Sequence, residues 1–339
     1  MRRCAVLGLV VLSMACGRGQ GVAPDGGGPM IVADGGLRGD AGAQVSLRRC
    51  PTSGAGAMEG EVCFVITPAE TGLPASGAGA TVDQYALRPP SNPRGLLLLF
   101  FNGSGGSPRA GTGTSAGSWY GVARAQGLHV LAPSYVSGSA VGTLCGGMDA
   151  CFEPTRTTIL TGDFVAGTPQ SLGDITFDEA AFDRIVAALL TLADSDRDGR
   201  WSDFLDRTKL PDAEAAIRWD KVIVSGHSQG GGHAALIGKR QSVARVVMLA
   251  SPCDSVGGSV ATWLASPVGY RTEPATKFFG LAAMGDTICP RAPDAWRALG
   301  MTSTAQTRDA VICPLETPHG APLSCDRNAS TWARLLTTP

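Results

Sequence analysis

The chain has 339 residues, of which 44% are hydrophobic and 17% charged, and its net charge at pH 7 is -1. This composition excludes a wholly disordered polymer and suffices for one domain of about 200 to 300 residues with a full-sized core. Lys and Arg number 28 against 29 Asp and Glu, and no dense basic run supplies the positive surface that phosphate binding needs. Nucleic acid is therefore not an expected partner.

The first residues have the layout of an export signal. Two Arg precede an apolar run that ends in small residues, MRRCAVLGLVVLSMAC, and this run is too short to span a bilayer as a mature helix. Its end, Leu12 to Cys16, looks like a lipobox, in which the Cys is diacylated and becomes the mature N-terminus, although Ser13 stands where a Leu is usual. We predict a lipoprotein signal peptide over residues 1–16, with simple secretion as the alternative.

Residues 17–48 are rich in Gly, with Pro, Asp and Ala, and show no apolar periodicity. Such a stretch cannot bury enough surface to offset its chain entropy. It is expected to be a flexible linker that holds residues 49–339, the predicted domain, away from a membrane. An ordinary disordered N-terminus is the alternative. The lipid on Cys16 would be the only membrane contact, and the oligomeric state stays open.

The cysteines fit an exported protein. Ten Cys occur in the chain, and setting aside the two in the signal peptide leaves an even number, for which disulfides are the default in an oxidising compartment. The short loop CGGMDAC favours a pair between Cys145 and Cys151, and Cys50 with Cys63 is a weaker second choice. A zinc site is not expected, because no CxxC pair occurs and only four His are present.

Short apolar runs alternate with helical patterns from about residue 49 onward. The expected elements in chain order are a strand at 96–101, a helix at 118–126, a strand at 129–132, a helix at 177–193, a strand at 221–225, a helix at 230–240, strands at 244–250 and 278–283, and a short helix that includes 295–299. Strands that alternate with helices predict an α/β fold, with a mostly parallel sheet covered on both faces.

The segment GHSQG at 226–230 matches GxSxG, a strand-to-helix turn that lifts a serine hydroxyl above the edge of a sheet. A second match surrounds Ser115. It follows a loop of Pro, Gly and Ser with no apolar strand before it, so we interpret it as loop composition. Ser228 is preceded by KVIVS and followed by GGGHAALIGK, a strand and a helix in the required order. Ser228 is the candidate nucleophile.

A serine nucleophile needs a base, normally a histidine oriented by a carboxylate. His227 lies inside the elbow, His233 lies one turn into the following helix, and His129 opens an early strand, so each is better explained as a packed or surface residue. His319 lies in the loop TPHG, between residues that break regular structure. It is the candidate base.

The chain order Ser, acid, His places the orienting carboxylate between Ser228 and His319. Asp286 directly follows the apolar run FFGLAAMG, which predicts a position at the C-terminal end of a late strand, where such folds build their sites. Asp254, after ARVVMLASP, is the main rival. We favour Asp286, and an exposed loop aspartate is the alternative for both.

Acyl transfer also needs donors for the oxyanion. One is usually the backbone N–H after the nucleophile, here that of Gln229, and another comes from a loop after an earlier strand. The loop FNGSGG after LLLLFF can supply the second, with Ser104 our choice and Gly103 or Gly105 close alternatives. A plain Gly-rich turn is the competing interpretation.

Four features in this order, NGSGG, GHSQGG, MGDTICP and a late PHG, resemble the α/β-hydrolase superfamily, in particular its secreted bacterial esterase and lipase-like members. The resemblance covers about residues 85–325. It implies a sheet of about eight strands, hydrolysis of a small-molecule or lipid-like ester through an acyl-enzyme, and no required cofactor. One departure is Asn102, which stands where a His is frequent in the oxyanion loop.

Two alternatives accompany this interpretation. GHSQGGG also resembles elbows in secreted polymer hydrolases, which favours a polyester or lipid depolymerase. An alternative of another class is a surface-anchored binding module that depends on Ca²⁺ and uses a hydrolase scaffold.

The substrate pocket of a hydrolase is expected to be shaped by loops that include residues 136–176.

The calcium idea comes from one acidic loop. Asp194, Asp196 and Asp198 followed by Gly199 put oxygen ligands at positions one, three and five and Gly at six, which is how an EF-hand loop begins. Position twelve breaks the pattern because it is Leu205 rather than Glu. A structural Ca²⁺ site and a solvated acidic loop both stay open.

Overall fold

The structure is a computed structural model that describes residues 48–50, 62–73, 75–112, 118–265, 269–301 and 303–337. The predicted signal peptide, nearly all of the predicted linker and the second GxSxG match lie outside these residues. The chain divides into two units, residues 1–37 and 38–339, and every described residue belongs to the second. Among the described helices, none has the length and apolar character required to cross a bilayer.

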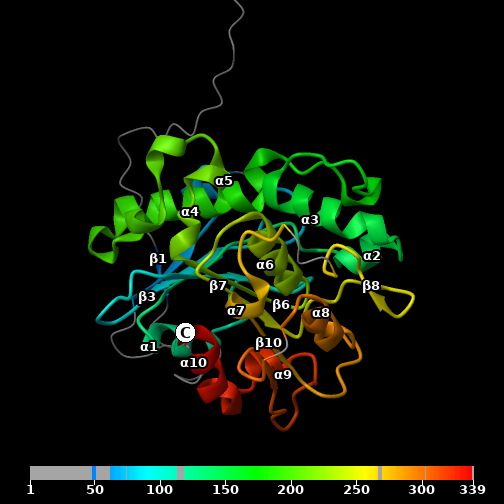
Figure 1. The fold of residues 1–339 in the computed structure, drawn as a ribbon. Coiled ribbons are helices and arrows are strands. Elements are labelled where there is room, and N and C mark those ends of the chain that lie inside the picture. Colours follow the sequence, from blue (N-terminus) through cyan, green and yellow to red (C-terminus); the bar gives the residue numbers. More distant parts are fainter. Residues whose placement is uncertain are drawn as a thin grey trace, which may run out of the picture. The chain divides into compact units, whose positions relative to one another are not determined.

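A sheet of nine strands forms the centre of the second unit (Figure 1). Its strands follow the spatial order β1-β2-β3-β5-β4-β6-β7-β10-β11. In chain order they are β1 (Arg48–Arg49), β2 (Val62–Ile66), β3 (Gln84–Arg88), β4 (Leu97–Phe101), β5 (His129–Ala132), β6 (Val222–His227), β7 (Arg245–Leu249), β10 (Phe278–Ala282) and β11 (Thr307–Asp309). Two short strands, β8 (Ser255–Val256) and β9 (Ser259–Val260), pair separately.

The sheet is mostly parallel, as the sequence predicts. Every neighbouring pair from β5 through β11 runs parallel, whereas β1, β2 and β3 pair antiparallel and β3 joins β5 antiparallel. A chain needs a crossover connection between parallel strands, and helices supply it here. The two-residue β1 adds a ninth strand to the roughly eight expected.

The apolar run at β4 shows why these sequences form strands. β4 lies between β5 and β6, and all of its residues are buried. Side chains alternate between the two faces of a strand. Leu97, Leu99 and Phe101 therefore join the core on one face, and Leu98 and Phe100 join the core on the other. A continuous apolar run satisfies both faces of a central strand.

Helices cover both faces of the sheet (Figure 1). Helices α3, α4 and α6 pack on the face of Leu99, and α1 and α10 pack on the face of Leu98, where Trp119 and Trp332 meet edge to face. The helices are α1 (Trp119–Ala125), α2 (Val141–Cys145), α3 (Phe152–Thr161), α4 (Ala181–Ser195), α5 (Ala213–Ala216), α6 (Gln229–Arg240), α7 (Pro274–Lys277), α8 (Ala292–Ala298), α9 (Ala321–Ser324) and α10 (Ala329–Thr337).

The expected elements are present, with shifted ends. The helix expected at 177–193 begins as a 3-10 turn at Phe177–Glu179 and continues as α4. The sequence pattern missed β2, β3, α3 and α10. Helix α3 was missed because its buried residues include Thr155, Arg156, Thr157 and Thr158, so it has no apolar stripe.

Every cysteine that the structure describes is in a disulfide. The two expected pairs, Cys50–Cys63 and Cys145–Cys151, are both present. The other two pairs are Cys253–Cys289 and Cys313–Cys325. Four disulfides fit an exported protein, because they persist in oxidising compartments.

We expect Leu99→Ala to lower the free energy of unfolding by about 2 to 5 kcal/mol, because Leu99 is fully buried in the central strand and its truncation leaves a cavity. Denaturant unfolding measures the change. The control is Val82→Ala, since Val82 is 36% exposed and its truncation should stay within about 0.5 kcal/mol. Equal losses in the two variants would contradict this account of the core.

Candidate active site

Ser228 lies on a strained turn between β6 and α6. Its backbone has a φ of 55° and a ψ of -122°, a left-handed region that side chains with a Cβ rarely occupy. Such a conformation costs about 1 to 3 kcal/mol and persists only where the surroundings enforce it. The turn occupies the place that the GxSxG pattern predicts, directly after a buried strand and at the start of a helix.

Two glycines make this turn sterically possible. A Cβ on Gly226 would lie 2.1 Å from the carbonyl carbon of Gly230, and a Cβ on Gly230 would lie 2.1 Å from the carbonyl oxygen of Phe101. Both obstacles are backbone atoms, which cannot move aside as a side chain can. Only glycine fits at these two positions.

The structure brings Asp286 and His319 together. Asp286 follows β10, is 7% exposed, and has its Oδ2 atom 2.8 Å from His319 Nδ1. Its other oxygen, Oδ1, accepts hydrogen bonds from the N–H groups of Ile288 and Cys289 at 2.9 and 3.1 Å. A carboxylate only accepts, so Nδ1 carries the proton that it donates to Asp286. In the neutral ring, Nε2 then has the free lone pair that a general base needs.

The rival acid, Asp254, has other partners. Its carboxylate binds the guanidinium of Arg156, with 2.8 Å between Oδ2 and Nε, and the indole N–H of Trp263 at 3.0 Å. The side chains of this ion pair are 1% and 2% exposed. The structure therefore places Asp286 beside His319, whereas Asp254 forms an ion pair with Arg156.

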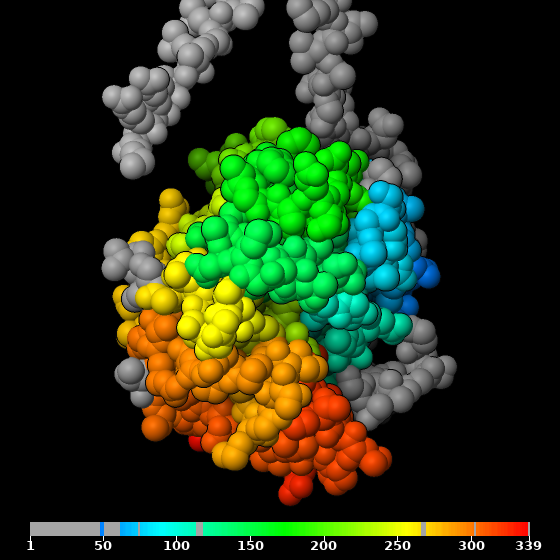
Figure 2. Space-filling model, turned by 90° about the vertical axis from the view of Figure 1, so that its right-hand side faces the viewer, coloured from blue at the N-terminus to red at the C-terminus, as the bar shows by residue number. Residues whose placement is uncertain are grey.

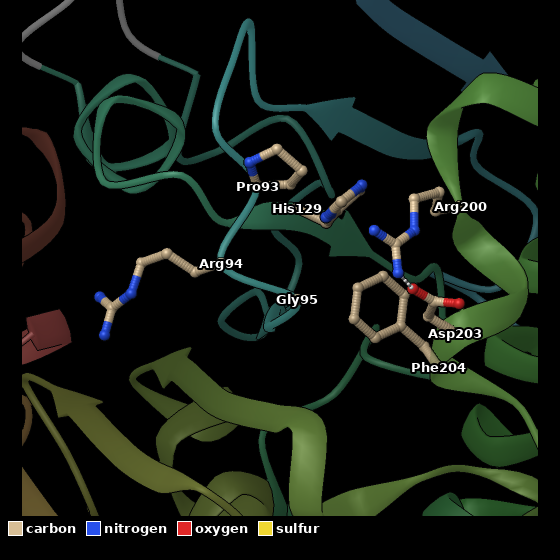
Figure 3. A pocket seen from close by; sticks show the side chains of 7 residues that line it. All are labelled: Pro93, Arg94, Gly95, His129, Arg200, Asp203 and Phe204. Carbon is tan, nitrogen blue, oxygen red and sulfur yellow. Dashed lines mark ion pairs between the residues drawn. The ribbon is translucent and has the colours of Figure 1, made fainter.

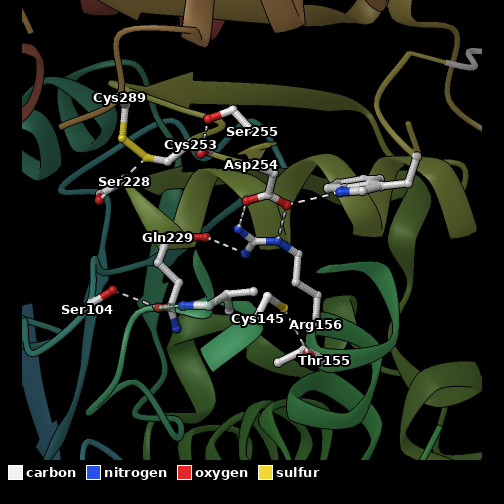
Figure 4. Close-up of polar contacts among 12 residues, drawn as sticks. Ser104, Cys145, Thr155, Arg156, Ser228, Gln229, Cys253, Asp254, Ser255 and Cys289 are labelled. Atoms are coloured by element: carbon white, nitrogen blue, oxygen red, sulfur yellow. Dashed lines mark hydrogen bonds and ion pairs between the residues drawn. A yellow bond between two sulfur atoms is a disulfide. The ribbon is translucent and has the colours of Figure 1, made fainter. Parts of the chain in front are cut away.

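In the part of the chain that the structure describes, the Ser228 hydroxyl makes no hydrogen bond to Asp286 or His319. Among the described residues, its contact is Cys253 Sγ, at 3.9 Å from Oγ (Figure 4). The His319 loop is fixed beside the elbow by a second bond, because His227 Nε2 donates to the His319 carbonyl oxygen at 2.8 Å. The two imidazole rings have centroids 4.8 Å apart. In proteins without substrate, catalytic hydrogen bonds are often not yet formed.

The loop after β4 also lies against the elbow, as the sequence predicts. A Cβ on Gly103 would lie 3.2 Å from Ser228 Cβ. Ser104 Oγ donates to Gln229 Oε1 at 2.7 Å, and the N–H of Val141 donates to the same oxygen at 3.2 Å (Figure 4). The side chain of Gln229 thus ties the candidate oxyanion loop to the start of α2.

Burial keeps the other three histidines neutral. Burial lowers the pKa of His227 to about 4, although the hydrogen bond to the His319 carbonyl raises it in part. Burial also holds the pKa of His233 well below its usual value and lowers the pKa of His129, whose Nε2 donates to the Gly199 carbonyl at 2.8 Å. Within the described part of the chain, His319 is the one histidine of the four that bonds to a carboxylate.

The acidic loop meets cationic partners from the protein itself. Asp196 Oδ1 lies 2.9 Å from Arg88 Nη1, and Asp194 Oδ1 lies 3.0 Å from Arg207 Nη2. In the part of the chain that the structure describes, the three aspartates including Asp198 do not form a group with oxygens within 4.8 Å of one another. Calcium would have to displace arginine from these carboxylates, and Ca²⁺ binding stays an untested prediction.

Two other clusters have metal-type ligand atoms within 4.8 Å of one another. They are Asp286 with Cys289 and His319, and Cys313 with Cys325 and Asp326. Each contains disulfide-bonded cysteine. A metal binds the thiolate form of cysteine, and a disulfide sulfur offers none. Neither cluster is a metal site in this state.

A cavity lies beside the segment before β4 and the start of β5 (Figure 3). It is at the N-terminal ends of β4 and β5 and is lined by Pro93, Arg94, Gly95, His129, Arg200, Asp203 and Phe204. Arg200 and Asp203 form an ion pair at 2.7 Å. Parallel α/β folds build their sites at the C-terminal ends of strands, so this cavity is not part of the candidate active site.

No protein-family profile matches the chain, and no curated protein matches its sequence. Solved structures to which the chain is similar include an S-formylglutathione hydrolase from Agrobacterium tumefaciens, with 12% identity, 83% of this chain and 97% of that chain covered, and a TM-score of 0.45. Another is EstE1, a thermostable carboxylesterase cloned from a metagenomic library, with 13% identity, 87% and 92% covered, and a TM-score of 0.38. A third is TT1662 from Thermus thermophilus, with 15% identity, 77% and 97% covered, and a TM-score of 0.38.

The strand order and the serine turn define the class of fold. A mostly parallel sheet with antiparallel strands at one edge, helices on both faces and a GxSxG turn between β6 and α6 make up the α/β-hydrolase fold. The chain has this fold, as the resemblance in its sequence implies.

We expect the protein to lose stability as the pH falls from about 6.5 to about 4. Above that window His227 is neutral in both states. Within this window His227 of the unfolded chain becomes protonated, whereas buried His227 of the folded protein stays neutral down to its pKa of about 4. This difference lowers the free energy of unfolding by up to about 3 kcal/mol. Urea unfolding at pH 7.5 and pH 4.5 measures the loss. His227→Gln, which retains a donor for His319, should reduce it, and an unchanged pH dependence in this variant would refute the assignment.

Proposed function

We propose that the protein is a serine hydrolase that cleaves carboxylic esters through an acyl-enzyme. The observation that carries this proposal is the position of Ser228 on a turn that only glycines permit, at the same sheet edge as an imidazole that Asp286 orients. A strained serine, a base with a free Nε2 and a buried carboxylate are the parts that nucleophilic acyl transfer requires.

In the proposed reaction, Ser228 Oγ attacks the ester carbonyl and His319 Nε2 takes its proton. Asp286 keeps the imidazole in the required tautomer and stabilises its protonated form. The tetrahedral intermediate then expels the alcohol, which receives the proton from His319. Water, deprotonated by the same imidazole, then attacks the acyl-enzyme. The second tetrahedral intermediate releases the carboxylic acid, and Ser228 Oγ takes the proton back from His319. Backbone N–H groups of Gln229 and of the loop at Ser104 stabilise the oxyanion in both halves.

One movement is needed before the first step. Ser228 Oγ contacts Cys253 Sγ and makes no hydrogen bond to His319 among the described residues, so the hydroxyl has to reorient toward His319 Nε2. Staggered rotamers of a serine are separated by small barriers, and substrate binding can select the reactive one. The reaction uses only side chains and water, so we propose that it requires no cofactor.

We also propose export. The disulfides are consistent with an oxidising compartment, and the N-terminal signal pattern supplies the route. Cys16 would then carry a lipid and keep the domain at a membrane surface, with plain secretion as the alternative.

Replacing Ser228 by Ala should lower kcat on a short p-nitrophenyl ester by about 10³-fold or more, because the nucleophile is removed. Labelling by a fluorophosphonate probe should also be lost. The matched control is Ser115→Ala, the serine of the second GxSxG pattern, which should keep both activities. Full activity in Ser228→Ala would refute the proposed function, and a wild-type protein that resists labelling would favour a binding module.

A second candidate function rests on exposed apolar side chains near the proposed triad. Of the nine large hydrophobic side chains that are exposed among the described residues, five lie on the two loops that carry Asp286 and His319. These rim residues are Met284, Ile288, Val311, Ile312 and Leu315, with exposed fractions from 39% to 106%. The orange and red segments that contain the two loops are adjacent on one face in Figure 2.

Scattered exposed apolar residues are ordinary, whereas a cluster marks a contact surface. The two loops meet at the Asp286–His319 hydrogen bond, so the rim lies beside the proposed chemistry. An ester with a large apolar part, or one displayed on an apolar surface, would cover the rim. This favours a lipid or polyester substrate over a small soluble ester.

Met284→Ser combined with Ile312→Ser should lower the rate on an emulsified triglyceride or a polyester film by about tenfold or more. Each apolar side chain that the substrate covers contributes about 1.5 to 3 kcal/mol. The rate on a soluble p-nitrophenyl acetate should change by less than about twofold. Val82→Ser with Phe177→Ser is the control, since both side chains are exposed and lie outside these two loops and outside residues 136–176. Equal effects on both substrates would exclude this role for the rim.

A further inference from the structure

The disulfide Cys253–Cys289 connects two loops of the candidate active site (Figure 4). Cys253 follows β7 and Cys289 follows β10, and these strands are parallel neighbours whose C-terminal ends meet at one edge of the sheet. The two residues are 36 apart in sequence, with Cα atoms 4.6 Å apart. This bond is the covalent link between the environment of Ser228 and the loop of Asp286.

On the nucleophile side, the disulfide contacts Ser228 directly. Cys253 Sγ lies 3.9 Å from Ser228 Oγ and 3.7 Å from the carbonyl oxygen of Ala250. A sulfur at this distance is in van der Waals contact with the hydroxyl oxygen. The other sulfur belongs to Cys289, which is 2% exposed.

On the acid side, the same disulfide fixes the residue that holds Asp286. The N–H of Cys289 donates to Asp286 Oδ1 at 3.1 Å, and the Cys289 carbonyl accepts from the N–H of Ala292, the first residue of α8. Of residues 284–290, only Asp286, Cys289 and its neighbour Ile288 contribute to this hydrogen-bonded turn.

The rest of this loop offers little packing that would hold it. Met284, Gly285, Thr287 and Ile288 are all exposed. The buried anchor after Asp286 is therefore Cys289, and its side chain is held by a covalent bond rather than by an apolar pocket.

We propose that Cys253–Cys289 is a positioning element for Asp286, and through it for the His319 imidazole. The inference rests on the proposed ester hydrolysis and assigns to the disulfide the alignment of the carboxylate. A displacement of about 1 Å in a catalytic group can cost about 10²-fold in rate. Loss of the disulfide should therefore lower kcat and leave substrate binding nearly unchanged.

The test is the double variant Cys253→Ala with Cys289→Ala, in the full chain. We expect kcat on a short p-nitrophenyl ester to fall by about 10- to 100-fold, with KM within about twofold. The matched control is Cys50→Ala with Cys63→Ala, which removes the disulfide between β2 and the segment after β1. It should keep the wild-type kcat below its melting temperature. Circular dichroism establishes that each variant is folded.

A double-mutant cycle separates positioning from a merely structural role. Asp286→Asn alone should lower kcat by about 10⁴-fold, by analogy with other triads. If the disulfide acts through Asp286, adding the two Cys replacements to Asp286→Asn should change kcat by less than about threefold. Losses that multiply in the combined variant would overturn the proposal.

The outcomes also distinguish this proposal from the proposed function. An active Ser228→Ala refutes ester hydrolysis by this serine whatever the disulfide does. An inactive Ser228→Ala together with a wild-type kcat in the double Cys variant overturns the positioning role alone. If the double Ala variant does not fold, Cys253→Ser with Cys289→Ser, which fills nearly the same volume, serves the same comparison.

Discussion

The close approach of three backbone segments determines where the candidate active site can form. Gly226 at the end of β6, Gly230 in the first turn of α6 and the carbonyl of Phe101 at the end of β4 meet without room for a Cβ. Ser228 is forced into its left-handed conformation between the two glycines. The loop with Ser104 continues from Phe101, so the contact that orients the nucleophile also places the candidate oxyanion loop beside it.

Parallel strand register then gathers residues from distant parts of the sequence. The C-terminal ends of β4, β6, β7 and β10 lie at one sheet edge, where they present Ser104, Ser228, Cys253 and Asp286. His319 follows no strand of this central group. It reaches the site through two hydrogen bonds, one to Asp286 and one from His227 to its carbonyl. The His227 that burial keeps neutral is thus a donor that holds the loop of the candidate base.

The sequence predicted the elbow and the elements with strong local signals, but it missed β2, β3, α3 and α10. A continuous apolar run such as β4 satisfies both faces of a central strand. The two glycines of the elbow occur where a Cβ would clash with neighbouring backbone atoms. The sequence favoured Asp286 over Asp254 from position alone, since both follow buried strands. Arg156 on α3 distinguishes the two aspartates, because it binds Asp254. The sequence pattern does not predict α3, since the buried face of this helix is polar. The pairing of Cys253 with Cys289 likewise depends on strand adjacency that spacing does not reveal.

Two buried aspartates at the same edge therefore have different electrostatic roles. Arg156 balances the charge of Asp254 inside the protein, and its Nη1 also donates to the Gln229 carbonyl at 2.9 Å. An unpaired carboxylate there would oppose the negative charge that develops on the proposed oxyanion, and leaving it unpaired would cost about 3 to 5 kcal/mol. Among the described residues, Asp286 has no such cation as a partner, and it bonds to two backbone N–H groups and His319. Its charge is thus left to stabilise a positive imidazole. Asp254 neutralises the permanent charge of Arg156, whereas Asp286 would stabilise the charge that His319 gains during the reaction.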